Sequence, residues 1–172
     1  AKTLKKHTLN NTINQQKKDL LLSDAILPMP SEKPKEYSNL NEKSSVVLLT
    51  GATGFLGSQV LSELIKTTAT RIYCLVRNDS LPTLQNNLIK RLHETGISHE
   101  RYRIQWLIGD LNKRHLGLSD NLFLNLTKSI DIIYHIGAQI HHIYPYEQLK
   151  STNVTSTLTL LELAGTYRLK RL

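Results

Sequence analysis

The 172-residue chain has one cysteine, Cys74, so it cannot form an intramolecular disulfide bond. A lone cysteine is typical of a reducing compartment, and we expect the protein to be cytoplasmic. The sequence also lacks a run of about 18 apolar residues, so we expect no membrane-spanning helix. These absences argue against a disulfide-rich scaffold and against a helix that crosses a membrane.

Acidic residues are fewer than basic ones: 14 Asp and Glu stand against 22 Lys and Arg, for a net charge of +8. A basic chain favours an anionic partner such as a nucleic acid, an acidic lipid or a phosphorylated small molecule. No long basic run, zinc knuckle or RNA-binding signature occurs, so we expect no nucleic-acid partner. His135, His141 and His142 lack helical spacing and a Cys or carboxylate partner, so we also expect no metal site.

The composition changes near residue 45. Residues 1–44 are polar and carry Pro28, Pro30 and Pro34 close together, and their only apolar cluster lies at 20–27. We therefore predict a linker or lead-in segment over 1–44, with one short helix that docks on the rest. Residues 45–172 have the regular pattern of a folded domain.

Four short apolar runs rich in β-branched residues predict strands buried on both faces. They begin roughly 30 residues apart, the length of a βαβ unit, and lie at 46–49, 72–76, 104–108 and 130–134. Helical apolar stripes fill the gaps, beginning near residues 56, 84, 122 and 154, with Ser119 as a predicted N-cap. This order predicts an α/β fold, a Rossmann-like doubly wound parallel sheet truncated after the fourth βα unit. A fifth strand is expected directly after residues 168–171.

A glycine-rich turn, G-x-x-G-x-x-G, joins the first predicted strand to the first predicted helix. Glycine lets the backbone approach a pyrophosphate closely, and the helix N-terminus offers free N–H groups to the phosphates. It is not a P-loop, because no Gly-Lys-Ser/Thr follows. A turn that binds no ligand is the alternative. The candidate cofactor-binding residues here are Thr50, Gly51, Thr53, Gly54, Phe55, Leu56 and Gly57.

The residue that follows the second strand selects between the two nicotinamide cofactors. An acidic residue there would bind the ribose 2′-hydroxyl of NAD, but this chain has Arg77. A guanidinium can bind a 2′-phosphate with two hydrogen bonds, so we predict NADP. The alternative is a solvated charge at the strand end.

Two further loops complete the predicted site. After the third strand, Asp110 can accept from the adenine amino group while Leu111 packs near the ring; a turn-capping Asp is the alternative. After the fourth strand, Gly137 and Ala138 are small enough for the backbone to pass close to the ribose and nicotinamide. His135 is expected to be packed rather than reactive.

Seven segments occur in the order found in a known family: 51–57, 73–77, 109–111, 116–119, 134–138, 144–146 and 153–154. Together they resemble the thioester reductase domain of nonribosomal peptide synthetases, some polyketide synthases, carboxylic acid reductases and aminoadipate reductase. That domain is an extended short-chain dehydrogenase/reductase. Residues 24–28 look like the lead-in that follows a carrier domain in these enzymes.

The resemblance implies hydride transfer from NADPH to an acyl thioester on the phosphopantetheine arm of a carrier domain, giving an aldehyde or alcohol. Its catalytic Ser/Thr and Tyr-x-x-x-Lys follow the fifth strand, so we expect them beyond Leu172 and assign no catalytic residue here. The family also commonly has an Arg where this chain has Asn87. A fatty acyl-CoA reductase, a nucleotide-sugar epimerase and a non-catalytic NADP sensor are the alternatives.

Tyr146 and Lys150 also have the Tyr-x-x-x-Lys spacing, which places both on one helix face. They follow the fourth strand instead of the fifth, so we expect no proton-transfer role for them. Pro145 is expected at the start of their helix.

Overall fold

The computed structural model describes residues 2–27, 36–37, 45–80, 82, 85–86, 90 and 103–172. The elements before the centre of the chain are α1 (Lys2–Asp24), β1 (Glu36–Tyr37), β2 (Val46–Thr50), α2 (Phe55–Thr67), β3 (Arg71–Val76) and the 3-10 helix η1 (Asn78–Ser80). The later ones are β4 (Ile104–Ile108), η3 (Arg114–Gly117), α4 (Asp120–Ser129), β5 (Ile132–His135), α5 (Tyr146–Lys150), the π-helix η4 (Ser151–Thr155), α6 (Ser156–Gly165) and β6 (Arg168–Leu169).

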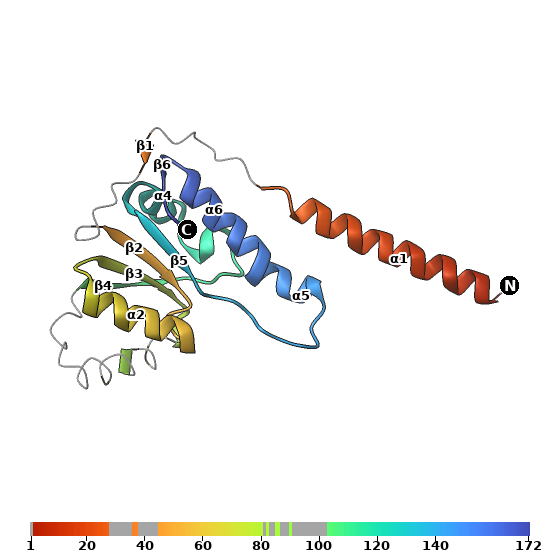
Figure 1. Cartoon of the computed structure of the whole chain (residues 1–172), viewed down its shortest axis with the longest axis horizontal. Helices are drawn as coiled ribbons and strands as arrows, with labels where there is room; N and C mark the ends of the chain where they lie inside the picture. The colour runs from red at the N-terminus through yellow and green to blue at the C-terminus, as the bar shows by residue number, and fades with distance from the viewer. Residues whose placement is uncertain are drawn as a thin grey trace.

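The four long strands form one parallel sheet in the order β4-β3-β2-β5 (Figure 1). The first of them in the chain, β2, therefore lies between β3 and β5. The chain crosses from one side of β2 to the other, which makes the switch point of a doubly wound sheet. The predicted Rossmann-like fold is confirmed.

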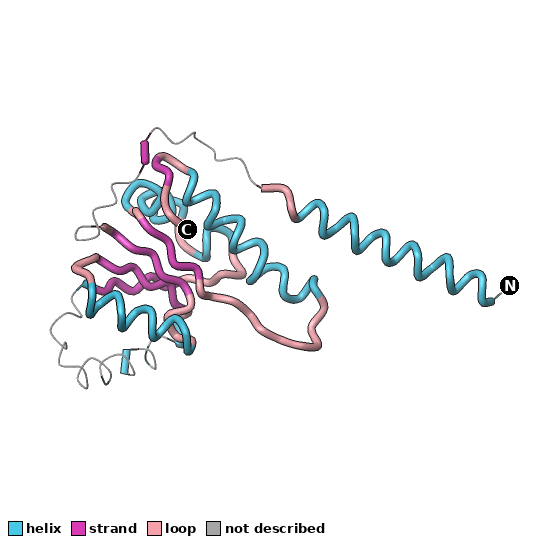
Figure 2. Tube along the Cα trace, in the orientation of Figure 1, coloured by secondary structure: helices cyan, strands magenta, loops and turns pink. Residues whose placement is uncertain are grey.

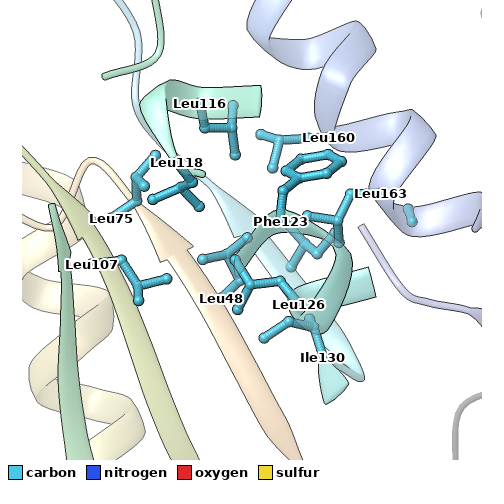
Figure 3. Packing of buried hydrophobic residues seen from close by; sticks show 12 residues of the cluster. Leu48, Leu75, Leu107, Leu116, Leu118, Phe123, Leu126, Ile130, Leu160 and Leu163 are labelled. Carbon is cyan, nitrogen blue, oxygen red and sulfur yellow. The ribbon is translucent and has the colours of Figure 1, made fainter. Parts of the chain in front are cut away.

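Helices cover both faces of this sheet because its strands alternate apolar side chains between them. Val47 and Leu49 of β2 pack in the cluster that includes α2, whereas Leu48 packs in the cluster of α4 and α6. Figure 3 shows Leu48 in this second cluster, where the ring of Phe123 from α4 lies next to Leu160 of α6. Ser119 caps α4 as predicted, because its hydroxyl accepts from the N–H of Leu122 at 3.3 Å. The predicted stripe at 84–92 falls largely outside the described residues.

The fourth strand begins two residues later than predicted. Ile130 instead ends α4, and its N–H donates to the carbonyl of Leu126. Asp131 turns its carboxylate toward β2, where Oδ2 accepts from the N–H of Val46 at 2.8 Å. These two contacts close the connection between α4 and the sheet.

The prediction of a short helix before residue 45 was wrong in length, since α1 has 23 residues. The predicted length was based on the short apolar cluster at 20–27. A longer polar helix can nevertheless form from residues of good helix propensity such as Lys, Leu and Gln. Figure 2 shows α1 extending away from the sheet. None of the helices in the described ranges is long and apolar enough to cross a membrane.

Two contacts of the chain ends were not predicted from local patterns. In the lead-in, β1 pairs in parallel with β6, with Glu36 opposite Arg168. Beyond β6, Arg171 forms a parallel bridge with Ile132, and its carbonyl accepts from the N–H of Ile133 at 2.8 Å. The chain therefore returns beside β5 just before the position at which the sequence predicts a fifth strand.

Candidate cofactor-binding site

A cavity of about 500 Å³ lies at the carboxyl ends of the strands. The structure brings to it the predicted residues Gly51, Thr53, Arg77, Asp110, Leu111, Gly137 and Ala138. Leu75, Val76, Gly109, Asn112, Gln139 and Thr152 also line it. Loops far apart in the sequence therefore meet here because parallel strands end at the same edge of the sheet.

Two glycines of the turn are required by close backbone packing. Gly51 has φ +74°, and a Cβ on it would lie 2.5 Å from the backbone nitrogen of Gly137. A Cβ on Gly57 would lie 2.0 Å from the carbonyl oxygen of Gly51, so α2 contacts the turn only because this residue has no side chain. Gly54 is less constrained, since its Cβ would lie 3.4 Å from the same oxygen. The structure therefore explains the first and last glycines sterically.

The first turn of α2 offers backbone donors beside the glycine turn. Gly54 is its N-cap, and the first intrahelical bond runs from the N–H of Ser58 to the carbonyl of Gly54. The N–H groups of residues 55–57 precede that bond and can donate to an anion. The side chains of Phe55 and Leu56 are 84% and 60% exposed and do not line the cavity. These two residues can contribute through their backbone.

Thr50 is fully buried and positions the neighbouring loop instead of lining the cavity. Its hydroxyl lies 2.7 Å from Nδ1 of His135 and accepts from the N–H of Gly137 at 3.1 Å. His135 is half-buried, its Nε2 lies 3.2 Å from the hydroxyl of Thr157, and desolvation lowers its pKa. The expectation that His135 is packed is confirmed.

Arg77 lies at the rim of the cavity, directly after β3. Its side chain is 66% exposed, and Nε lies 3.7 Å from Oδ1 of Asp79. An exposed ion pair of this length is weak, so the guanidinium remains available to an anionic ligand. Asn87, where the family commonly has a second Arg, lies outside the described residues.

For Asp110 the structure shows the turn-capping contact, one of the two alternatives that the sequence left open. Its Oδ1 accepts from the backbone N–H of Asn112 at 2.9 Å and from Nδ2 of the same residue at 3.2 Å. Asp110 thus caps its own turn. It nevertheless lines the cavity, where its carboxylate can accept from a ligand.

Sequence reasoning missed the polar wall formed by Asn112, Gln139 and Thr152. The side-chain oxygen of Asn112 accepts from the hydroxyls of Ser151 and Thr152, which joins the loop after β4 to the π-helix η4. No short-range spacing signals such a contact, because its partners lie 39 and 40 residues apart. Single-turn π-helices are common at functional sites, but the sequence pattern does not reveal them.

Asn153 fixes the loop that follows β5. Its Oδ1 accepts from the backbone N–H of Gln139 at 2.8 Å, and its Nδ2 donates to the carbonyl of Gln139 at 2.8 Å. Together with the bond from Gly137 to Thr50, this amide holds residues 137–139 against the cavity. The motif at 153–154 thus has a positioning role.

The switch-point cavity, the glycine turn and the free N–H groups of α2 define a nucleotide-binding domain of the Rossmann type. Residues 49–172 match the family of NAD-binding domains described as male sterility protein, and the chain belongs to that family.

Three similar proteins relate this family to reductases. The chain is 38% identical over 125 residues to the large subunit of L-2-aminoadipate reductase from Candida glabrata, covering 69% of this chain and 9% of that protein. The terminal R domain of the myxalamid PKS-NRPS pathway is 38% identical with a TM-score of 0.73, covering 86% of this chain and 39% of that one. A thiolation-reductase di-domain from an archaeal nonribosomal peptide synthetase is 28% identical with a TM-score of 0.56, and the match covers 75% of this chain and 26% of that one. This chain therefore spans less than half the length of each.

Proposed function

We propose that this chain is the NADP-binding part of a thioester reductase, which reduces a carrier-bound acyl thioester to an aldehyde or alcohol. The observation that carries the proposal is the cavity at the switch point, where the glycine turn, Arg77 and the loops after β4 and β5 meet. The similarity to proteins named as reductases supports the same reaction class.

The residues present fit a dinucleotide phosphate. The pyrophosphate would bind the N–H groups of residues 55–57. These groups lie close to Gly51, where a Cβ would clash with the backbone of Gly137. Arg77 would bind the 2′-phosphate, which is the reason for proposing NADP over NAD. Asp110 would accept from the adenine amino group and Leu111 would pack against the ring. Gly137 and Ala138 would face the ribose and nicotinamide.

NADPH supplies hydride when bound, and the described residues only hold it. A Cβ on Gly137 would lie 2.6 Å from Cδ1 of Leu111, so the absence of a side chain lets Leu111 pack directly against this loop. Asn153 and Thr50 keep the loop at 137–139 in place. We propose that the proton-transferring groups lie outside this chain, as in the family it resembles.

We further propose a cytoplasmic carrier domain as the partner that presents the thioester. A thiolation-reductase di-domain among the similar structures supports this arrangement. The phosphopantetheine arm is covalently held, so the thioester would reach the cavity at high effective concentration.

The test uses the complete protein that contains this chain, with an acyl thioester loaded on the phosphopantetheine arm. NADPH oxidation and mass spectrometry of the trapped aldehyde or alcohol report the reaction. We expect turnover with NADPH and the carrier-bound thioester. Reduction of acyl-CoA alone would indicate a fatty acyl-CoA reductase. NADPH binding without reduction of any thioester would indicate a sensor, and no NADPH binding would overturn the proposal.

A further inference from the structure

The end of the lead-in helix contacts the domain through one carboxylate. Asp24, the last residue of α1, accepts a hydrogen bond from the hydroxyl of Tyr146 at 2.8 Å through Oδ2. Its Oδ1 lies 2.7 Å from Nζ of Lys150. The Asp24 side chain is only 15% exposed at this contact. Residues 122 positions apart thus share one polar contact.

The Tyr-x-x-x-Lys spacing explains how two groups reach the same carboxylate. Tyr146 and Lys150 are four residues apart at the two ends of α5, so their side chains lie on one face. Each binds a different oxygen of Asp24. Hydrogen bonds from Lys150 and Tyr146 hold the pKa of Asp24 below its ordinary value, so the carboxylate is charged at neutral pH. The Tyr-x-x-x-Lys spacing, which is known from catalytic pairs, here places two side chains so that both bind one carboxylate.

This contact is continuous with the wall of the cofactor cavity. The helical backbone runs from Lys150 directly into η4, where Thr152 lines the cavity and Ser151 donates to Asn112 at 2.7 Å. Any element fixed on α5 is therefore fixed relative to the cavity. The lead-in has a second attachment at β1, which pairs with β6.

We propose that Asp24, Tyr146 and Lys150 form a docking contact that holds the end of α1 on α5. The docked helix sets the direction from which a carrier domain joined to the lead-in approaches the cofactor cavity. This consequence rests on the proposed function. The docking contact itself is a property of the chain and can be measured without any reaction.

The structural test measures the distance between spin labels on α1 and α5. Gln16 and Gln148 are exposed and suit cysteine labelling, whereas the native Cys74 is fully buried. We expect one narrow distance distribution in the otherwise unchanged protein. Asp24→Asn removes the charge and should shift the equilibrium toward the released helix by at least roughly fivefold, because the upper range for exposed ion pairs is a lower bound for this partly buried pair. A broad distribution before any substitution would overturn the proposal.

Asp19→Asn is the matched control, since Asp19 lies on the same helix and accepts only a local bond from Gln15. We expect it to leave the distance unchanged. Asp24→Lys should release the helix, and Asp24→Lys combined with Lys150→Asp should restore docking. Release by Asp19→Asn, or no restoration by the exchanged pair, would contradict a specific contact.

The functional test compares two substrates in the complete protein. Asp24→Asn should lower reduction of the carrier-bound thioester several-fold and leave reduction of a free acyl-pantetheine within twofold of the unchanged protein. If Asp24→Asn and the unchanged protein reduced the carrier-bound thioester at equal rates, the docking contact would have no role in directing the carrier domain to the cavity. A narrow label distance without any reductase activity would overturn the proposed function while the docking contact stands.

Discussion

The hydroxyl of Thr50 lies 2.7 Å from Nδ1 of His135, and this contact joins the carboxyl ends of β2 and β5. The neighbouring bonds determine which ring nitrogen carries the proton. The hydroxyl of Thr157 donates to the carbonyl of Asn153, so it can only accept from Nε2–H of His135. Because desolvation lowers the pKa of His135, the ring is neutral at pH 7, and Nδ1 accepts from Thr50.

Thr50→Val keeps the shape but removes both bonds of the hydroxyl. The N–H of Gly137 and Nδ1 of His135 would lose their partner, so we expect about 1–3 kcal/mol less stability and weaker NADPH binding. Urea unfolding and calorimetry measure the two effects. Thr67→Val is the control, because Thr67 is exposed and bonds only within its helix. Equal effects of both substitutions would contradict the positioning role.

Gly57→Ala should destabilise the fold, because its Cβ would meet the carbonyl oxygen of Gly51 at 2.0 Å and displace α2. Overpacking of this kind costs about 1–3 kcal/mol. Gly54→Ala is the matched control, since its Cβ would lie 3.4 Å from the same oxygen. Thermal unfolding of the two variants compares them directly, and a smaller loss at position 57 than at position 54 would refute the packing argument.

Arg77→Ala tests the choice of cofactor. Loss of a charge-assisted contact with the 2′-phosphate should weaken NADP binding by about 1.5–3 kcal/mol and leave NAD binding little changed. Isothermal titration of both cofactors provides the measurement. Arg114→Ala controls for net charge, because Arg114 is exposed and does not line the cavity. A similar loss for NADP and NAD at position 77 would rule out a 2′-phosphate role.

Tyr146→Phe tests whether this tyrosine transfers a proton. We expect reduction of a free acyl thioester to fall less than tenfold, against the roughly 10²–10⁴-fold contribution of a general acid. The reason is that its hydroxyl donates to Asp24 in the docking contact. A loss in the larger range, with NADPH affinity unchanged, would show that Tyr146 is catalytic.

The lowered pKa of Lys170 should make the stability of the folded protein depend on pH in the alkaline range. Desolvation, with a smaller effect of Arg168, lowers its pKa from 10.5 to about 8, while Asp131 acts in the opposite direction. Between pH 8 and 10.5 the unfolded chain keeps this proton and the folded chain has lost it. The stability of the protein relative to Lys170→Met should therefore rise with pH through this window. Chemical denaturation at several pH values measures the difference, and a constant value would contradict the lowered pKa.

The sheet could be predicted from local signals because its strands are buried on both faces. Near-continuous apolar runs identified β2, β3 and β4, and the glycine turn located the start of α2 to within a residue. The start of β5 was less well predicted, since the run counted from Ile130 enclosed Asp131, and these two residues close the connection from α4. Apolar pattern alone does not separate a strand from the buried residues that lead into it.

The cavity was only partly predictable. Residues directly after predicted strands, such as Arg77 and Asp110, could be assigned because parallel strands end at one edge. Gln139 and Thr152 could not be assigned to the cavity from the sequence. They belong to a loop and a π-helix whose placement depends on hydrogen bonds between residues that are not neighbours in the sequence. Thr50 was placed among the cofactor contacts, but burial gives it a supporting position.

The sequence by itself determined the order of strands and helices, the turn that needs glycine at positions 51 and 57, and the family to which these motifs belong. Those features depend on the spacing and size of neighbouring side chains, which the sequence states directly. The tertiary structure decided which polar groups meet: Thr50 with His135, Asn112 with η4, and Asp24 with Tyr146 and Lys150. Such pairs form only after the sheet and helices have packed, because chain segments that are distant in sequence must first be brought within hydrogen-bonding distance.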